Sequence, residues 1–367
     1  MKFTIDKDII LRETAHALDI ISTRNTITVL SNVFLAVDHG NLTLRASDLK
    51  VNYQARIPVE MDQEGVTTVP CDKLAGILRS SPPGEIEFET SEDGTLSVRP
   101  LGKKIDFTLR TLPPDRFPEF PSTYDSDFVE IPQSDFVEMI AHTIFAVSDD
   151  ETRYFMNGTF LDQVDGNITM VATDSHRLAH CKKALGANLG GSGVIVPPKI
   201  LTLIRKFCTG EGSLLLAISD RNLHVQVEHR RINSGLIDAQ FPNIKSVIPE
   251  SQDHRLIVDR ANLTEALRRV SVMVEQKSRR VLLEAESGNL TVQCSEGDVG
   301  TAREEIPCEY DGSAISLALN YQYLLDPLKE MDTDQVVLAF TAPNKAITLS
   351  AEPERHYFHV IMPMQVG

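Results

Sequence analysis

The segment 173–181 contains the residue types of a chemical site. His176 and His180 lie four residues apart, and Cys181 follows directly. On a helix, this spacing would place two imidazoles and a thiolate on one face, a donor set suited to zinc. The preceding apolar run, Ile168–Val171, instead predicts a strand followed by a turn, on which neighbouring side chains point to opposite faces. A metal site is therefore the disfavoured interpretation of this segment.

The same segment holds the residue types of a nucleophilic triad, Asp174, Ser175 and His176. Adjacent positions on a strand or turn do not converge, so an exposed loop between strands is the simpler interpretation. The sequence contains no Gly-x-x-x-x-Gly-Lys-Ser/Thr loop and no Gly-x-Gly-x-x-Gly that opens a helix. We therefore expect no catalytic residues, no cofactor and no metal. A hydrolase that uses His176 stays as a distant alternative.

The charge of the chain restricts its partners. Among 367 residues, 36 Lys and Arg stand against 52 Asp and Glu, a net charge of −16. An anionic protein is repelled by phosphate at long range, which argues against the usual basic nucleic-acid-binding protein. Cations nevertheless gather on two expected helical regions, around Lys199–Lys206 and Arg268–Arg280.

Cysteine usage and hydropathy indicate the compartment. The cysteines are five in number, scattered, and without a Cys-x-x-Cys pair, which argues against a disulfide framework. No stretch approaches the ~18 apolar residues of a membrane span, and acids interrupt the first residues where a signal peptide needs an apolar run. We expect a cytoplasmic protein without a membrane partner.

One short pattern occurs three times. Gly40–Leu44, Gly166–Met170 and Gly288–Val292 each read Gly-Asn, an apolar residue, Thr and a second apolar residue, and they start 126 and 122 residues apart. Gly-Asn between alternating runs predicts a hairpin turn, because both residues tolerate positive φ. This spacing indicates three whole domains, which we place at 1–126, 127–252 and 253–367.

Each copy shows the same order of expected elements. An opening strand leads into a helix, a second helix follows, and alternating strands close the copy. The helical spacing of Leu11, Ala15 and Leu18 predicts the buried face of the first helix. The fold class is α+β, with two helices on a largely antiparallel sheet in each copy. The opening strand–helix pairs are Phe3–Ile21, Phe128–Val147 and Leu256–Val274; the second helices are Asp72–Arg79, Pro198–Phe207 and Tyr321–Met331.

Several motifs together resemble one family. They are Met1-Lys2-Phe3, Val69-Pro70, Thr173–Leu178, Phe241-Pro242 and the terminal Val360–Met364, in this order on the threefold repeat. The chain closely resembles, end to end, the bacterial sliding clamp, the beta subunit of DNA polymerase III. The resemblance implies three tandem DNA-clamp domains, a ring-shaped homodimer around duplex DNA, and no catalytic activity. It implies as partners the DNA polymerase III alpha subunit, the clamp loader delta subunit, and other clamp-binding-motif proteins of repair and translesion synthesis.

The resemblance also implies site residues. The DNA contacts it implies are Arg24, Arg153, Tyr154, Lys199, Arg269, Lys277 and Arg279. The partner pocket it implies consists of Met156, Thr173, His176, Arg177, Leu178, Pro242, Val247, Asn320, Tyr323, Val360, Met362, Pro363 and Met364. This sequence departs from the family with Ser175 for a glycine, with Ser246 for an arginine, and with Asp149-Asp150 where relatives have polar DNA-contacting residues.

For the ring joint, the resemblance implies an apolar contact and a polar rim. The apolar contact is Phe107 and Leu109 with Val272 and Met273; the rim is Lys73 and Lys104 against Glu304. The competing hypothesis is a DNA-independent scaffold of three repeated domains that presents peptide pockets. Because such a scaffold needs no ring, the mass and shape of the oligomer separate the two.

Overall fold

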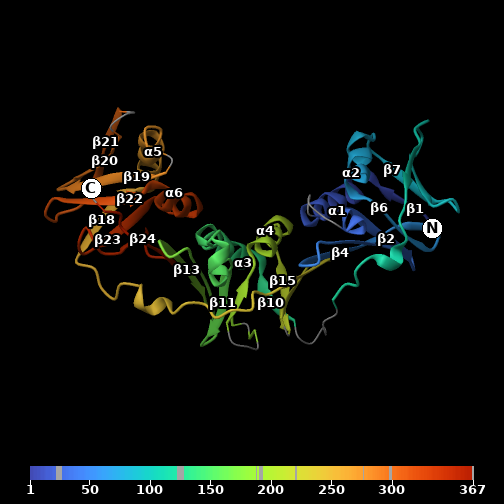
Figure 1. Ribbon diagram of the computed structural model, residues 1–367, viewed down its shortest axis with the longest axis horizontal. Helices are drawn as coiled ribbons and strands as arrows, with labels where there is room; N and C mark the ends of the chain where they lie inside the picture. Colours follow the sequence, from blue (N-terminus) through green and yellow to red (C-terminus); the bar gives the residue numbers. More distant parts are fainter. Residues whose placement is uncertain are drawn as a thin grey trace. The chain divides into compact units, whose positions relative to one another are not determined.

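The computed structural model describes residues 1–21, 27–121, 128–186, 188–189, 193–219, 221–275, 277–296 and 300–365. Three successive stretches repeat one element order: a strand, a helix, four strands, a second helix and three strands, with one extra short strand in the first stretch (Figure 1). The expected α+β class with antiparallel sheets is confirmed. No helix in the described ranges is long and apolar enough to cross a bilayer.

The bounds of the elements follow the repeat. The first copy comprises β1 (Lys2–Asp6), α1 (Lys7–Ile20), β2 (Asn32–Asp38), β3 (Asn41–Ser47), β4 (Val51–Pro58), β5 (Glu60–Gln63), β6 (Gly65–Pro70), α2 (Cys71–Ser80), β7 (Glu85–Thr90), β8 (Thr95–Pro100) and β9 (Phe107–Arg110). The second comprises β10 (Val129–Pro132), α3 (Gln133–Ala141), β11 (Thr159–Val164), β12 (Asn167–Thr173), β13 (Arg177–Lys183), β14 (Val194–Val196), α4 (Pro198–Phe207), β15 (Ser213–Ser219), β16 (Asn222–Val227) and β17 (Arg230–Gly235). The third comprises β18 (His254–Asp259), α5 (Arg260–Ser271), β19 (Arg280–Glu286), β20 (Asn289–Glu296), β21 (Gly300–Glu309), β22 (Ile315–Asn320), α6 (Tyr321–Glu330), β23 (Gln335–Phe340), β24 (Ile347–Glu352) and β25 (Tyr357–Ile361).

The repeated Gly-Asn pair forms hairpins, but the turn is one residue earlier than expected. His39 and Gly40 are the two central residues, with φ of 45° and 73°, and Asp38 pairs with Asn41 across the turn. Positive φ at both central positions is the requirement of a type I′ turn, which matches the twist of the flanking strands. The asparagine therefore starts the second strand, and the residue before the glycine adopts the left-handed conformation.

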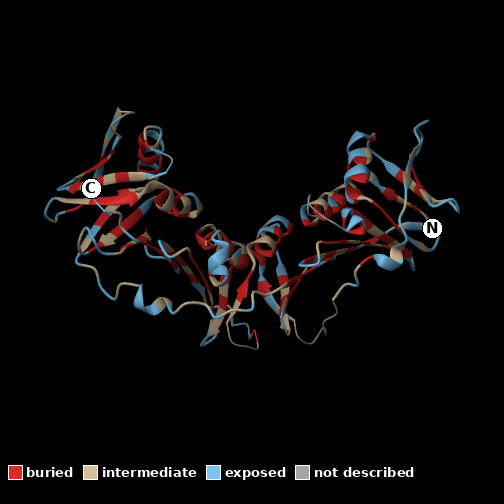
Figure 2. Cartoon of the chain, in the orientation of Figure 1, coloured by how far each residue is buried: buried red, intermediate tan, exposed pale blue. Residues whose placement is uncertain are grey.

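The buried face of α1 also differs from the expected one. Leu11, Ala15 and Leu18 are only half-buried, whereas the fully buried face runs through Ile10, Glu13, Thr14, Ala17 and Ile20. The expected face was wrong because a glutamate occupies a core position, which apolar periodicity assigns to solvent. Figure 2 shows the buried residues gathered between the helices and the sheets they cover.

The chain forms two compact units, residues 1–133 with 202–236, and residues 134–201 with 237–367. The first unit holds a five-stranded sheet, β5-β1-β7-β8-β9, and an eight-stranded sheet, β10-β15-β16-β17-β4-β3-β2-β6. The second holds a twelve-stranded sheet, β14-β11-β12-β13-β25-β24-β23-β18-β21-β20-β19-β22. Sheets therefore continue from one copy into the next: β17 pairs with β4 inside the first unit, and β25 pairs with β13 inside the second.

A buried ion pair reinforces the first of these junctions. The Glu13 side chain on α1 is 1 % exposed and the Arg230 side chain on β17 is 6 % exposed. Arg230 Nη2 lies 2.7 Å from Glu13 Oε1 and its Nε lies 2.9 Å from Oε2, while the Tyr53 hydroxyl also donates to the carboxylate. Burial alone would raise the pKa of Glu13, but hydrogen bonds from His229, Arg230 and Tyr53 outweigh it and hold this pKa far below its usual range.

Removing one partner of this pair should be costly. Glu13→Ala leaves the Arg230 guanidinium buried without its carboxylate, and we expect it to reduce the free energy of unfolding by about 3–5 kcal/mol in denaturant titrations. The double variant Glu13→Leu with Arg230→Met should recover most of this loss, because it removes both charges. Glu265→Ala, which breaks an exposed pair with Arg268, is the matched control and should change stability by less than about 0.5 kcal/mol. A Glu13→Ala variant as stable as this control would contradict the account.

Candidate functional site

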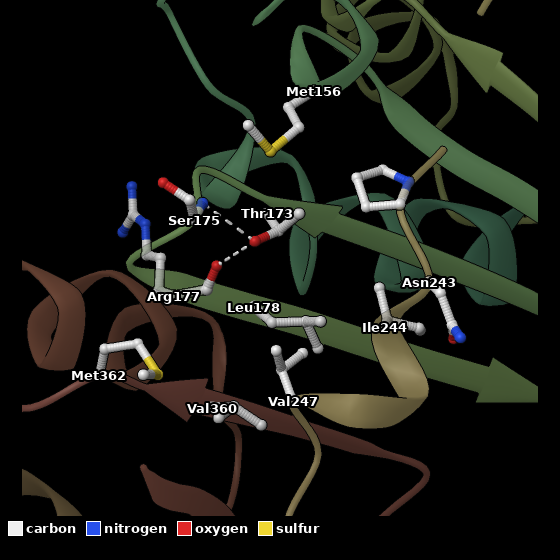
Figure 3. A pocket seen from close by; sticks show the side chains of 11 residues that line it. Met156, Thr173, Ser175, Arg177, Leu178, Asn243, Ile244, Val247, Val360 and Met362 are labelled. Atoms are coloured by element: carbon white, nitrogen blue, oxygen red, sulfur yellow. Dashed lines mark hydrogen bonds between the residues drawn. The ribbon is translucent and has the colours of Figure 1, made fainter. Parts of the chain in front are cut away.

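A pocket of about 200 Å³ opens beside the hairpin formed by β12 and β13. Its lining comes from four places: the 3-10 segment Glu151–Met156, the β12–β13 hairpin, the segment after Phe241, and the end of β25. Figure 3 shows the Leu178, Val247 and Val360 side chains close together in its floor, with Met156 above them. The lining residues are Met156, Thr173, Ser175, Arg177, Leu178, Pro242, Asn243, Ile244, Val247, Val360 and Met362.

The floor of the pocket depends on the junction between β13 and β25. Leu178 pairs with Val360 in the sheet register, and both side chains join a buried cluster with Val171. Phe160 and Phe241 stack beneath it, with ring centroids 4.8 Å apart. Leu178 and Val360 are buried, so tight packing holds this part of the floor in place, whereas Met362 at the edge is 42 % exposed. The arrangement suits apolar side chains of a short ligand.

The β12–β13 turn is fixed by its own hydrogen bonds. The Thr173 hydroxyl donates to the Arg177 carbonyl at 2.7 Å and accepts from the Ser175 amide at 3.2 Å (Figure 3). Ser175 has φ of 74°, a conformation that glycine adopts without strain. A serine at this position adopts a left-handed conformation that would suit a glycine better.

The Arg177 guanidinium is fully engaged within the protein. Its Nε lies 3.0 Å from Asp174 Oδ2, its Nη1 lies 2.7 Å from Asp326 Oδ2, and its Nη2 donates to the Phe145 carbonyl. The group also lies over the Tyr323 ring, 4.6 Å from the centroid. Two carboxylates balance its single charge, so Arg177 stiffens the pocket wall and offers no free charge to a ligand.

Three imidazoles pack around the β25 side of the same junction. His142 stacks on Tyr357 at 3.6 Å between ring centroids, its ring lies 6.1 Å from His359, and His180 stacks on Phe358. Burial lowers the pKa of His142 to about 4 and that of His180 to about 4, and it moves the pKa of His359 well below its ordinary value. Within the described ranges both ring nitrogens of His359 lack a hydrogen-bond partner. All three rings are therefore neutral at pH 7.

Eight of the thirteen expected pocket residues line this pocket: Met156, Thr173, Arg177, Leu178, Pro242, Val247, Val360 and Met362. The other five, His176, Asn320, Tyr323, Pro363 and Met364, are not part of this lining. The His176 carbonyl accepts from the Met362 amide, Asn320 caps α6, and Tyr323 lies under Arg177. The Met364 amide donates to the Ala318 carbonyl at 2.8 Å, which ties down the chain around Pro363.

The expectation omitted three lining residues, Ser175, Asn243 and Ile244. Asn243 accepts from the Lys245 amide and starts a short 3-10 helix, Ile244–Ser246, which turns Ile244 toward Leu178. An Asn directly after Pro242 is a helix-capping signal, so the sequence contained a cue for this turn.

The metal and triad interpretations of this segment find no support in its geometry. His176 lies in the turn and is exposed, His180 faces Phe358, and Cys181 is buried in β13. Burial raises the pKa of the Cys181 thiol to about 12, which keeps it protonated. In the part of the chain that the structure describes, no three His, Cys, Asp or Glu side chains gather as metal ligands.

The residues expected to contact DNA differ in exposure and in their ion pairs. Arg24 falls outside the described residues. Tyr154, Lys277 and Arg279 are exposed, and Lys199 is half-buried on α4. Arg153 is half-exposed and donates from Nη1 to the Ser175 hydroxyl at 2.8 Å. Arg269 forms a two-pronged ion pair with Glu304, at 2.6 and 2.8 Å, which raises the pKa of Arg269.

The expected joint residues lie at two strand edges. Phe107 and Leu109 are half-buried on β9, the last strand of its sheet. Val272, just after α5, is 79 % exposed, and Met273 lies against Gly300 at the start of β21. Of the residues expected in the polar rim, Glu304 pairs with Arg269 of its own chain, Lys73 lies 3.3 Å from Asp72, and Lys104 is exposed. Two residues expected in separate roles, Arg269 and Glu304, thus form one pair.

Comparison with known proteins agrees with this architecture. Three family models match in sequence: the DNA polymerase III beta subunit N-terminal domain at residues 1–121, its central domain at 130–243, and its C-terminal domain at 245–365. The chain belongs to the bacterial sliding clamp family. It is 43 % identical to the beta sliding clamp of Treponema pallidum and 32 % identical to that of Pseudomonas aeruginosa, each over the full length of both chains.

Solved structures of sliding clamps have the same fold. A Pseudomonas aeruginosa clamp bound to griselimycin matches with a TM-score of 0.94 and 30 % identity, and both chains are fully covered. A Bacillus subtilis clamp matches with the same TM-score at 24 % identity, which supports the fold alone. The chain therefore has three tandem clamp domains and the function of a sliding clamp, and this family consists of processivity factors for DNA synthesis.

The neutral histidines predict an acid-sensitive clamp. Because the folded-state pKa of His142 lies below its ordinary value of 6.5, the unfolded chain binds more protons between pH 6.5 and about 4. The free energy of unfolding should therefore decrease as the pH is lowered from 6.5 to about 4, by at most about 1.4 kcal/mol per pH unit for this group. Denaturant titrations at pH 7 and pH 5 measure the effect, and His142→Phe, which keeps the stack on Tyr357, should reduce it. His39→Asn, at an exposed histidine in a left-handed conformation that Asn tolerates, should leave the pH dependence unchanged. The same result for His142→Phe would contradict the assignment.

Proposed function

We propose that two chains join head to tail into a closed ring around duplex DNA. The observation that carries this proposal is the way the copies pair. The third strand after the first helix of one copy, β4 or β13, pairs with the last strand of the next copy, β17 or β25. The equivalent strands that remain are β21 of the third copy and β9 of the first. Each has an unpaired edge: β9 pairs only with β8, and β21 pairs along residues 300–307 with β20 alone, among the described strands.

An unpaired edge of this length is a template for another strand. Pairing β21 of one chain with β9 of a second chain would repeat the two internal junctions, and doing so twice closes a dimer. Apolar groups lie at both edges, with Leu101 48 % and Ile105 39 % exposed before β9 and Val272 beside β21. The joint therefore combines main-chain hydrogen bonds with burial of Phe107, Leu109, Val272 and Met273. We retain three domains, 1–126, 127–252 and 253–367, as the units of the ring.

A closed ring explains how a protein with a net charge of −16 can stay on DNA, which is also negatively charged. Topological linkage holds the protein on DNA without high affinity, and weak phosphate contact leaves it free to slide. Exposed cations such as Lys277 and Arg279 suit contact with DNA that does not depend on base sequence, and we propose Tyr154 and Lys199 as further DNA contacts. Arg24, which lies outside the described residues, stays a sequence-based proposal for the same role. The clamp performs no chemistry in this proposal; it tethers enzymes that do, and it acts in the cytoplasm where the bacterial chromosome is replicated.

We propose that this pocket is where the clamp binds its partner proteins. Its apolar floor and adaptable methionine edge fit a short peptide from a partner. We propose as partners the DNA polymerase III alpha subunit, the clamp loader delta subunit, and repair and translesion proteins that carry a clamp-binding motif. A peptide that fills such a pocket with a few side chains reaches roughly micromolar affinity, about −8 kcal/mol, which permits exchange.

The joint predicts a monomeric variant. Val272→Asp places a carboxylate in the proposed apolar contact and should convert dimers to monomers in sedimentation equilibrium, because an unpaired buried charge costs several kcal/mol. Val272 is 79 % exposed in the single chain, so the fold should persist by circular dichroism. Because the dimer is lost, the length of primer that DNA polymerase III extends in one binding event should also decrease. Leu49→Asp, at a residue 60 % exposed and away from the joint, is the control and should stay dimeric. A dimeric Val272→Asp protein would contradict the joint.

The pocket predicts a variant that loses partners and keeps the ring. Val247→Asp puts a charge in the pocket floor, and we expect at least a ten-fold loss of peptide affinity in fluorescence titrations, with unchanged dimer mass. Val164→Asp, at a residue 52 % exposed on β11 outside the pocket, should bind normally. Equal affinity of the two variants for a polymerase peptide would contradict the proposed role of the pocket.

A further inference from the structure

A second hollow, of about 460 Å³, lies over the β4–β17 junction of the first compact unit. Successive side chains of a strand point to opposite faces of the sheet. The Tyr53 hydroxyl on β4 donates to Glu13 on α1. Gln54 and Arg56 therefore lie on the opposite face, away from that helix. The hollow is lined by Asn41, Gln54, Arg56, Pro58, Gln226, Glu228, His229 and Arg231.

The strand register places cations and amides side by side on this face. Arg45 on β3 pairs with Gln54, which pairs on its other side with Arg231 on β17. The Arg45 Nε donates to Gln54 Oε1 at 2.8 Å. The Arg231 Nε donates to Gln226 Oε1 at 3.1 Å, across the next strand pair. We call Arg45, Arg56 and Arg231 the basic face; its amide neighbours position two of the guanidinium groups without adding charge.

The basic face carries charge that the protein does not neutralise. Arg56 is exposed, and within the described ranges its side chain forms no hydrogen bond or ion pair. Arg45 likewise has no ion pair in the part of the chain that the structure describes. Glu228 is the one acid among the described lining residues, and the Arg230 Nη1 already holds it at 3.0 Å. A chain of net charge −16 therefore presents a local positive charge on this face.

We propose that the basic face docks an acidic segment of a partner protein in an extended conformation. Neighbouring strands lie about 4.8 Å apart, so the backbones at Arg45 and Arg231 are about 10 Å apart. Arg56 lies two residues along β4 from Gln54, a distance of about 7 Å. Carboxylates at alternate positions of an extended chain are also about 7 Å apart. One acidic segment can therefore pair with two of these guanidinium groups at once.

A short acidic segment suits this face better than a nucleic acid does. The cations are confined to β3, β4 and β17, and acids border them. Asp38, which pairs with Asn41, is exposed on one side, and Glu228 lies in the β16–β17 turn on the other. A long polyanion would extend over these acids and be repelled, whereas a few carboxylates end before them. The basic face lies in the first compact unit and the apolar pocket in the second, so this inference does not depend on the role of the pocket.

The test measures binding of a fluorescein-labelled octapeptide, in which Ser and Asp alternate, to the full-length protein by fluorescence anisotropy. The same peptide with Asn for Asp is the neutral control and should bind more weakly. Arg56→Gln should weaken binding of the Asp peptide by about two- to five-fold, the range of an exposed ion pair. The double variant Arg45→Gln with Arg56→Gln should weaken it by about ten-fold. These differences should shrink as salt is raised to roughly 0.5 M.

Three matched variants separate the charge of the basic face from other effects. Arg56→Lys keeps the charge and should retain most of the affinity for the Asp peptide. Arg12→Gln, at an exposed residue of α1, removes the same charge from another surface and should leave the affinity unchanged. Glu228→Gln removes the acid that lines the hollow and can still accept from Arg230, so it should tighten binding by about two-fold. Circular dichroism checks that each variant is folded.

Three results would overturn the inference. The first is equal affinity of the Asp and Asn peptides for the unchanged protein. The second is an affinity for the Asp peptide that survives both Arg56→Gln and the double variant. The third uses a short DNA duplex as the probe: if Arg56→Gln weakens binding of the duplex and leaves binding of the Asp peptide unchanged, the face takes nucleic acid instead.

Discussion

Main-chain pairing between successive copies is the constraint on which the rest of the molecule depends. Each copy ends in a strand whose free edge needs a partner, and inside the chain that partner is the third strand after the first helix of the preceding copy. The two junctions, β4 with β17 and β13 with β25, turn three similar domains into continuous sheets. Main-chain hydrogen bonds are indifferent to side-chain identity, so the three copies can diverge in sequence and still join in the same way.

The pocket is a consequence of one of these junctions. Its floor exists because β25 brings Val360 against Leu178 on β13, and its edge exists because the chain continues from β25 to Met362. His180 on β13 and His359 on β25 belong to the same two strands, so the acid sensitivity predicted for the fold lies at this junction. The first junction instead contains the ion pair between Glu13 and Arg230. Two equivalent joints thus carry different polar groups, which gives each its own response to pH.

Sequence patterns predicted the periodic features of the fold and missed features that depend on paired polar groups. The second helix of the central copy, Pro198–Phe207, has the expected bounds, because apolar spacing and a leading proline mark it. The face of α1 was wrong because Glu13 is buried with a partner more than two hundred residues away. Likewise, no sequence pattern indicated that Arg269 and Glu304 form an ion pair, because folding has to bring β21 against α5 before the two side chains meet. Local pattern carries no information about such long-range partners. The resemblance to a family supplied most of the pocket residues, but not Ile244, whose place depends on a single turn.

The central claim is that the chain closes into a ring, and topology tests it most directly. Clamps loaded onto nicked circular DNA are separated from free protein by gel filtration, and the DNA is then cut at one site. The account predicts that the protein stays with the circle even in salt high enough to screen phosphate contacts, and that it leaves within minutes of linearisation. Protein that remains on linear DNA, or that leaves the intact circle as salt rises, would show that affinity rather than encirclement holds it there.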